Sequence, residues 1–245
     1  MPEAAQPIAG RGRLSATSTC GEAAGGSYDG NEGCGSRVGR FEPEKRGLEM
    51  TDAQQFASGD AGTMAADSES LILVDEADRE VGHMSKAQCH QGRGTLHRAF
   101  SLLIFNGSGE LLIQQRAASK RLWPLFWSNS CCSHPRCAES MESAIHRRLR
   151  EELGLHCPLH FLYKFQYHAQ FDAGAAEHEL CSVFIGRCTD PVRADRNEVL
   201  DWRWAPPEAL QAELSGSNAD KFTPWFKMEW KRVWREHRAA LLALQ

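Results

Sequence analysis

Three cysteines and a histidine lie within ten residues of the sequence, in the stretch SNSCCSHPRC that runs from Ser128 to Cys137. Thiols and imidazoles bind metal ions, form disulfides, or exchange protons with a substrate. Three interpretations are therefore open: a structural zinc site, a disulfide, or the edge of an active site. The zinc site would use Cys131, Cys132, His134 and Cys137, but it lacks a second paired C-x-x-C element downstream. Taken singly, Cys131, Cys132 and Cys137 can each be a buried structural thiol.

A second set of residues has the composition of a metal site. Three imidazoles and two carboxylates suit zinc, manganese or magnesium, and this set comprises His90, His97, His134, Glu177 and Glu179. The two glutamates are two residues apart, so a strand would point both toward one face and His178 toward the other. Taken singly, each histidine is more often an ordinary core or surface residue than a metal ligand.

Two charged residues fall on the apolar face of a helix predicted from Glu139 to about Leu153. At 100° per residue, Met141 and Ile145 define the apolar stripe, and Arg148 and Glu152 lie within about 20° of its axis. Either the two charges form an i, i+4 ion pair at a helix edge, or both face a ligand and a metal.

The elements around these residues predict an α+β fold, with a mixed sheet and helices packed on it. From Leu71, the runs LILVDE, AFSLLIFN and LLIQQR predict a strand and a hairpin. After the helix, YKFQYHAQF and HELCSVFIGRC predict two strands separated by DAGAAE, and VLDWRWA predicts a third. PPEAL then begins a helix with proline in its first turn. The last helix carries a stripe typical of core packing, formed by Phe226, Trp230, Val233 and Trp234.

Composition limits the classes of partner and the compartment. The chain has 245 residues, 42% of them hydrophobic, and 28 basic against 32 acidic side chains give a net charge of −4. No global positive field would therefore attract nucleic acid or an acidic membrane. No apolar run approaches the roughly 18 residues of a membrane span, and no secretory signal is recognisable, so we expect a cytoplasmic protein. Nine cysteines at irregular spacing indicate mostly reduced thiols.

The first part of the chain differs from the rest. Residues 1–68 are rich in Gly, Ala and Ser and show no lasting apolar period, so we predict a disordered extension before one domain over residues 69–245. Early acidic residues such as Glu3 and Glu22 weaken the alternative that this extension targets an organelle.

The predicted helix and the residues before it resemble the Nudix box, G-x5-E-x7-R-E-U-x-E-E-x-G-U, where U is aliphatic. The matching residues are Glu139, Arg147, Leu149, Glu151, Glu152, Gly154 and Leu155. Two positions depart, because Ser133 stands in place of the first glycine and Arg148 replaces the acid after the arginine. In Nudix hydrolases several glutamates hold divalent metals that help to cleave a diphosphate. An arginine in place of one acid removes a ligand and supplies a diphosphate partner, which favours binding over cleavage.

Five separated motifs together resemble the type I isopentenyl-diphosphate Δ-isomerase family, which has a Nudix-like fold. They are SKAQCHQGRGTLHRAFSLLIFN, QQRAASKRLWP, SNSCCSHP, AAEHELCSVF and FTPWF, and the resemblance runs from about Leu71 to the C-terminal helix. It implies an enzyme of isoprenoid biosynthesis that interconverts isopentenyl diphosphate and dimethylallyl diphosphate. The reaction adds a proton to one carbon and removes another from a neighbour, through a tertiary carbocation.

The resemblance also implies roles for the residues of the reacting centre. Cys132 and Glu179 would be the acid and the base on opposite faces of the flat substrate. Tyr167 would lie near the carboxylates, and the indole of Trp225 would stabilise the carbocation. Tyr167 and Trp225 can equally be core aromatic residues. The three histidines and two glutamates described above would coordinate one Zn²⁺, Mn²⁺ or Mg²⁺ ion.

Diphosphate binding would fall to four basic residues that match the family, namely Lys86, Arg116, Lys120 and Arg148. Glu152 would hold a Mg²⁺ ion that bridges the diphosphate, with the backbone carbonyl of Cys132 as a companion ligand. We expect a small-molecule diphosphate as the partner, neither nucleic acid nor membrane, and a monomer, with a dimer as the alternative. Two other functions stay open: a Nudix hydrolase of another diphosphate, and a non-catalytic zinc-binding interaction module.

Overall fold

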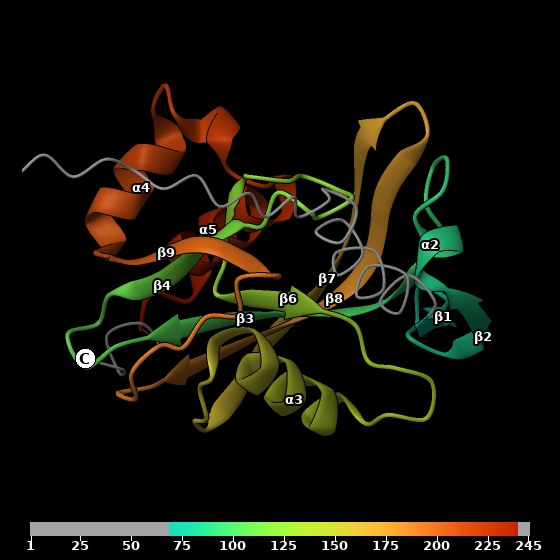
Figure 1. Ribbon diagram of the computed structural model, residues 1–245, viewed down its shortest axis with the longest axis horizontal. Helices are drawn as coiled ribbons and strands as arrows, with labels where there is room; N and C mark the ends of the chain where they lie inside the picture. The colour runs from blue at the N-terminus through green and yellow to red at the C-terminus, as the bar shows by residue number, and fades with distance from the viewer. Residues whose placement is uncertain (1–68, 240–245) are drawn as a thin grey trace, which may run out of the picture. The chain divides into compact units, whose positions relative to one another are not determined.

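The computed structural model describes residues 69–239, and the predicted disordered extension, residues 1–68, lies outside them (Figure 1). A mixed sheet with helices on it confirms the predicted α+β class. Its strands are β1 Ser70–Val74, β2 Glu80–Ser85, β3 His97–Phe105, β4 Leu111–Arg116, β5 Trp127–Ser128, β6 Cys131–Ser133, β7 Leu159–Asp172, β8 Ala175–Arg187 and β9 Val199–Ala205. The helical elements are α2 Lys86–Cys89, α3 Met141–Leu153, α4 Pro207–Ser215, the short 3₁₀ helix η1 Ala219–Lys221 and α5 Pro224–Glu236.

The central strand is β3, and its neighbours correct the predicted hairpin. β3 pairs in parallel with β8 from His97 to Phe105, and β6 pairs with it in antiparallel fashion. Its contact with β4 is limited to the pair Phe105 and Leu111, so the two strands meet only at the turn. β4 pairs instead with β5 and β9. The predicted hairpin was therefore wrong beyond its turn, because β8 pairs along one edge of β3, and β1 and β6 pair along the other.

The longest strand pair is the β7–β8 hairpin, and it is longer than the sequence predicted. The segment DAGAAE was expected to separate the strands, but only residues 173 and 174 do so. Ala175 and Ala176 are buried within β8, where pairing with β7 outweighs the low strand preference of alanine. Glu177 and Glu179 consequently lie well inside one strand.

The predicted helix at the centre of the chain is α3, which begins two residues later than expected. The hydroxyl of Ser140 accepts a hydrogen bond from the backbone N–H of Ser143 at 3.1 Å and caps its start. Gly154 ends it with φ of 66°, and an added Cβ there would lie 2.8 Å from the Cβ of Arg193. A left-handed backbone and a close neighbour together require glycine at this position.

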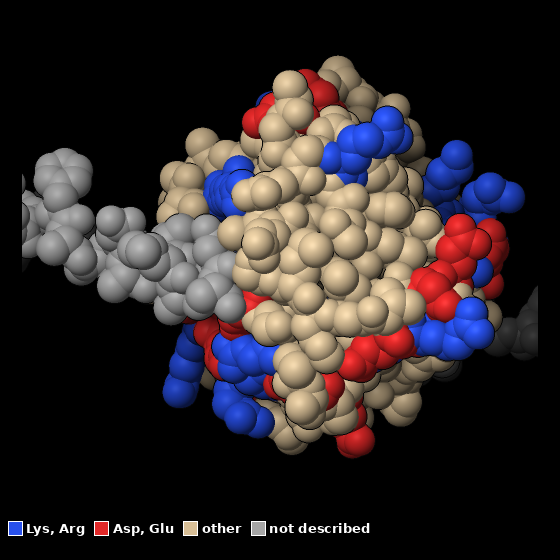
Figure 2. Space-filling view, turned by 90° about the vertical axis from the view of Figure 1, so that its right-hand side faces the viewer, with Lys and Arg blue, Asp and Glu red and all other residues tan. Residues whose placement is uncertain are grey.

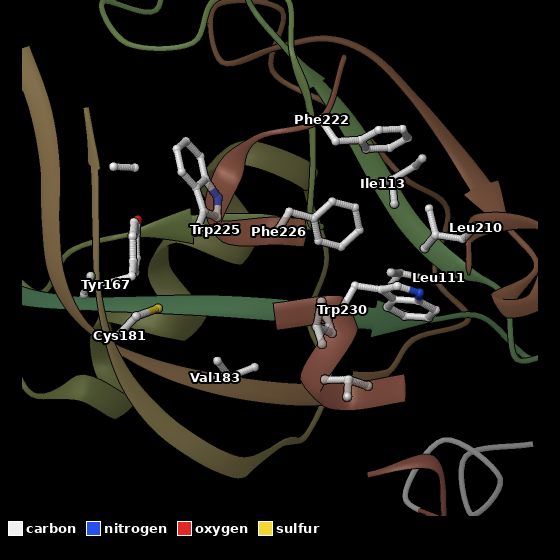
Figure 3. Packing of buried hydrophobic residues seen from close by; sticks show 14 of the residues in the cluster. Leu111, Ile113, Tyr167, Cys181, Val183, Leu210, Phe222, Trp225, Phe226 and Trp230 are labelled. Carbon is white, nitrogen blue, oxygen red and sulfur yellow. The ribbon is translucent and has the colours of Figure 1, made fainter. Parts of the chain in front are cut away.

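Helices cover both faces of the sheet because β3 is apolar on both. On one face Ala99 and Leu103 pack with the stripe of α5, and Figure 3 shows Trp225, Phe226 and Trp230 projecting from α5 among the strands. The predicted core role of this stripe is confirmed. On the other face Phe100, Leu102 and Ile104 pack against a second helix, α3, through residues that include Ile145 and Leu149.

One face of the surface gives a view of the charge distribution. Figure 2 shows an uncharged centre with basic and acidic side chains around its edge, so the described residues form no broad surface of one sign on this face. Between residues 69 and 239, no helix combines the length and the apolar character required for a membrane span.

Candidate metal and acid-base site

Five buried side chains from four parts of the fold converge on one point. They are His90, His97, His134, Glu177 and Glu179, and their ligand atoms lie within 4.8 Å of one another. The parallel register of β3 and β8 places His97 directly beside Glu179, while α2 and β6 each lead into one of the other histidines. His178, which points away along the same strand, contacts Gln166 instead. The structure thus brings together the whole set that the sequence singled out.

The hydrogen bonds around the histidines suit a metal ion. The Nδ1 atoms of His90 and His97 each lie 2.7 Å from a backbone carbonyl, of Lys86 and Thr95 respectively. Because a carbonyl only accepts, each Nδ1 carries a proton, and each Nε2 faces the other ligand atoms. The Nε2 atom of His90 lies 2.8 Å from Oε2 of Glu177, and the buried Nε2 atom of His97 has no hydrogen-bond partner among residues 69–239. Buried nitrogen and oxygen ligand atoms that face one point fit a bound cation.

Electrostatics keeps two of the imidazoles neutral, as ligation requires. Burial lowers the pKa of His97 to about 3 and holds that of His134 well below its usual value. Burial and the neighbouring charge of Glu177 raise the pKa of Glu179 to about 7. Burial also disfavours the charge of Glu177, but His90 outweighs this and lowers its pKa. The cluster therefore contains one carboxylate and one carboxyl group poised near neutrality.

Tyr167 donates a hydrogen bond to the carboxyl group of Glu179. It lies opposite Glu179 in the β7–β8 pair, and its hydroxyl donates a 2.7 Å hydrogen bond to Oε2 of Glu179. The other oxygen, Oε1, lies 2.9 Å from Nε2 of His134. Burial raises the pKa of Tyr167 well above its usual value, so the phenol stays a neutral donor. The ring of Tyr167 lies 6.3 Å from that of Trp225, and both are core residues, while Tyr167 also contacts the metal-ligand set through Glu179.

Cys132 is the cysteine of SNSCCSHPRC that contacts this site. It lies in β6, packs against the core cluster that contains Tyr167 and Trp225, and is 4.0 Å from a guanidinium nitrogen of Arg116. Burial raises its pKa to about 12, although the charge of Arg116 opposes the shift. Cys132 is therefore a thiol at neutral pH, able to donate a proton.

The other interpretations of this stretch do not fit. All seven cysteines between residues 69 and 239 are free, and the one group of three or more ligand side chains found there contains no cysteine. Cys131 is buried as expected, but Cys137 is exposed, so its prediction as a buried thiol was wrong. It lies in the turn that leads from β6 to α3, outside either core cluster.

Three of the four expected diphosphate ligands lie together. Burial lowers the pKa of Lys86, and the positive charges of Lys120 and Arg148 lower it further. Arg148 and Lys120 both pair with Glu198, a residue that the sequence analysis did not select. Glu198 thus neutralises part of a strongly cationic cluster.

Arg116 is turned away from that ion-pair network. Its Nε and one terminal nitrogen donate to the carbonyls of Trp123 and Leu122 at 3.0 and 2.9 Å. Its guanidinium lies 5.3 Å from the centre of the Trp225 ring. Arg116 therefore borders Cys132 and the indole rather than Lys120 and Arg148.

Of the two interpretations of the charged face of α3, the structure shows the ion pair. Arg148 and Glu152 form the i, i+4 ion pair, yet both side chains are largely buried on the face directed toward β6. Gln114 also donates to Glu152 at 3.2 Å and to the carbonyl of Ser130 at 3.0 Å. Among the described residues Glu152 is not part of a group of three ligand side chains, so a Mg²⁺ ion there would need oxygen atoms from its diphosphate.

Sequence reasoning missed a buried acid in α5. Glu229 is 1% exposed, and Ser101 donates a 2.7 Å hydrogen bond to its Oε2. Burial raises its pKa to about 8, the Ser101 hydrogen bond opposes this, and the charge of Glu179 adds to it. Glu229 lies three residues after Phe226 and four before Val233. The helical projection that singled out Arg148 would therefore have placed it on the apolar stripe.

Replacing Glu229 with glutamine is expected to change how stability depends on pH. Its folded pKa of about 8 exceeds the ordinary value of 4.5, so the folded state binds the extra proton and wild-type stability falls as pH rises between these values. Glutamine removes this dependence. Between pH 5 and 8.5, the free energy of unfolding of the variant should rise relative to that of wild type by at most about 5 kcal/mol. Urea unfolding at the two pH values measures this difference. Parallel pH curves for the two proteins would rule out a neutral buried Glu229.

Comparison with known proteins adds independent information. Residues 95–226 match the NUDIX domain family. The chain is 44% identical over 159 residues to isopentenyl-diphosphate Delta-isomerase 2 of Photorhabdus laumondii, covering 65% of this chain and 89% of that protein. It is 42% identical over 161 residues to isopentenyl-diphosphate Delta-isomerase of Halorhodospira halophila, covering 65% and 91%. Among solved structures, DR0079 from Deinococcus radiodurans has a TM-score of 0.56 at 22% identity, covering 68% and 100%, which supports the fold alone.

Proposed function

The chain belongs to the NUDIX domain family and, within it, to the isopentenyl-diphosphate Δ-isomerases of type I, and we propose that it interconverts isopentenyl diphosphate and dimethylallyl diphosphate. The observation that supports the chemistry is a half-buried thiol, Cys132, packed against the same core cluster as Tyr167, whose hydroxyl donates a hydrogen bond to the buried carboxyl group of Glu179. A shift of a double bond needs these two functions, because one carbon gains a proton while its neighbour loses one.

In the proposed mechanism, the thiol of Cys132 donates a proton to the terminal methylene carbon of isopentenyl diphosphate. The adjacent carbon becomes a tertiary cation, and the carboxylate of Glu179 removes a proton from the carbon on its other side. The reverse reaction exchanges the two roles. Arg116 lies beside the sulfur and would stabilise the thiolate that remains after the first step.

Two aromatic residues would assist these proton transfers. The hydrogen bond from Tyr167 fixes one oxygen of Glu179 and leaves the orientation of the carboxyl group defined. The indole face of Trp225 already lies against the cationic group of Arg116, and a ring face attracts positive charge without reacting with it. We therefore assign stabilisation of the carbocation to Trp225.

The histidine and glutamate cluster would hold one Zn²⁺, Mn²⁺ or Mg²⁺ ion, which would favour the ionised form of Glu179 and fix its position. Lys86, Lys120 and Arg148 would bind the diphosphate, with Arg116 at the end nearer the reacting carbons. Glu152 would hold a diphosphate-bound Mg²⁺ ion together with the carbonyl of Cys132. As expected from the sequence, we also propose a monomer in the cytoplasm.

The decisive experiment follows the substrate in deuterated water. Purified protein with Mg²⁺ and either C5 diphosphate should form the other isomer and incorporate deuterium, as seen by ¹H NMR, and a chelator of divalent metals should abolish both. A chain that releases phosphate or pyrophosphate instead would be a hydrolase. Arg148 argues against that outcome, because it occupies the position of an acid and pairs with Glu152. Absence of exchange in metal-loaded protein would refute the isomerase function.

A further inference from the structure

Asn129 is fully buried in the short step between β5 and β6, and its amide group has only one possible orientation. One amide atom lies 2.8 and 3.4 Å from the carbonyls of Cys131 and Leu102, and 2.7 Å from the hydroxyl of Ser101. Carbonyls only accept, so this atom must be the nitrogen. The amide oxygen consequently faces Nε1 of Trp225 at 3.2 Å, and an indole N–H only donates.

The amide of Asn129 thus joins two parts of the reacting centre. Its nitrogen holds the carbonyl of Cys131, the residue directly before Cys132, and its oxygen holds the indole of Trp225. We infer that Asn129 is a positioning residue that sets the indole of Trp225 relative to the thiol of Cys132. The catalytic roles of Trp225 and Cys132 in this inference rest on the proposed function, whereas the contacts of Asn129 do not depend on it.

The polar groups around Asn129 support this role by tying the first turn of α5 to β5. Ser128 donates a 2.8 Å hydrogen bond to the amide oxygen, and its hydroxyl is 2.9 Å from that of Thr223. Thr223 precedes α5 but does not cap it with its side chain, and its backbone N–H donates to the carbonyl of Trp127 at 2.9 Å. The hydroxyl of Thr223 therefore contributes to this junction rather than to the helix.

The indole is held on its ring as well as at its nitrogen. Figure 3 shows Trp225 projecting from the start of α5, with its nitrogen visible on the ring. Trp123 packs edge-on against it, with 5.2 Å between ring centres and an angle of 90°. Trp123 has a φ of 46°, unusual for a bulky residue, and its carbonyl is fixed by Arg116. Van der Waals contact limits the translation of the ring, whereas the hydrogen bond to Asn129 limits its rotation.

Replacing Asn129 with alanine should lower kcat by about tenfold to a hundredfold, because a small displacement of a reacting group has effects of this size. KM should change by less than about threefold, since the side-chain hydrogen bonds of Asn129 among the described residues go to Ser101, Ser128, Trp225 and backbone carbonyls rather than to the cationic residues. Ser130→Ala is the matched control. Its hydroxyl makes two buried hydrogen bonds, with the carbonyl of Leu112 and the N–H of Ile104, but none to Trp225. This control should lose stability and keep its kcat.

A double-mutant cycle distinguishes positioning of the indole from general damage. In a Trp225→Phe background there is no indole N–H to hold, so Asn129→Ala should lower kcat by a clearly smaller factor than in wild type. Equal factors in the two backgrounds, or a wild-type kcat in Asn129→Ala, would overturn the inference. In either case the wild-type enzyme would still turn over, so the proposed function would be unaffected.

A measurement on the wild-type fold covers the case in which Asn129→Ala does not fold. The chain has seven tryptophans, and the indole N–H signal of Trp225 is identified in ¹H–¹⁵N spectra as the one lost in Trp225→Phe. This proton should exchange with deuterated water at least about a hundredfold more slowly than that of an exposed indole, as expected for a closed, buried hydrogen bond. Exchange as fast as in the exposed indole would show that the hydrogen bond is not formed, and would overturn the inference.

Discussion

Replacing Cys132 with alanine is expected to slow the interconversion of the two diphosphates by about 10²- to 10⁴-fold, the range over which a positioned acid or base accelerates a reaction. The thiol is the protonated group at neutral pH, because burial raises its pKa to about 12. The neighbouring thiol of Cys131 cannot replace it, because Cys131 is buried in the opposite core cluster. Steady-state rates by ¹H NMR measure the effect, and circular dichroism confirms that the variant is folded.

The stretch SNSCCSHPRC contains a second cysteine, Cys137, that supplies a matched control for this substitution. Cys137→Ala removes a thiol five residues away that is exposed and contacts neither core cluster, and it should leave the rate unchanged. Cys132→Ser keeps the shape but replaces the thiol by a much weaker acid, so it should also be strongly impaired. Turnover near the wild-type rate in Cys132→Ala would remove this residue from the acid-base role.

Glu179→Gln is expected to have a comparable effect on the rate and a second effect on metal content. Glutamine preserves the shape and the hydrogen bond from Tyr167 to an oxygen atom, but it can neither take up a proton nor offer a carboxylate to a metal ion. We expect turnover to fall by about 10²- to 10⁴-fold and metal affinity to fall as well. Rates by NMR and metal content by atomic emission separate the two effects.

The strand that carries Glu179 also provides its control. His178→Gln alters the adjacent residue, which points to the other face and contacts Gln166, so rate and metal content should both be preserved. If Glu179→Gln retains the wild-type rate, the base must lie elsewhere. If it loses activity but keeps its full metal content, Glu179 acts in proton transfer without being needed as a ligand.

Local sequence patterns predicted where the helices and strands lie better than they predicted which strands pair with one another. The start and end of α3 follow from Ser140 and Gly154, and the stripe on α5 follows from its spacing, because both depend on residues close in sequence. The partial hairpin of β3 and β4 could not be foreseen. It depends on which distant strands, β8 and β6, occupy the edges of β3, and no short-range pattern encodes that choice.

In the site, too, residues marked by local spacing or motifs were predicted, and residues defined by distant partners were missed. The i, i+2 spacing of Glu177 and Glu179 already places both on one face, and the motifs of the family supplied the three histidines. Asn129 escaped notice because a single buried amide has no spacing that marks it, and its partners come from β3 and α5. Glu198 was missed because its importance lies in the cations that it neutralises, which are distant in sequence.

The parallel pairing that sets His97 beside Glu179 has a consequence for folding. Those two residues are separated by the whole of α3 and the β7–β8 turn, so an unfolded chain has no preassembled metal site. An ion that binds only the folded state stabilises it by mass action, about 2.7 kcal/mol when its free concentration is a hundred times its Kd. Metal supply would then control the lifetime of the folded enzyme as well as its activity, because a metal-depleted chain opens more often and is degraded sooner.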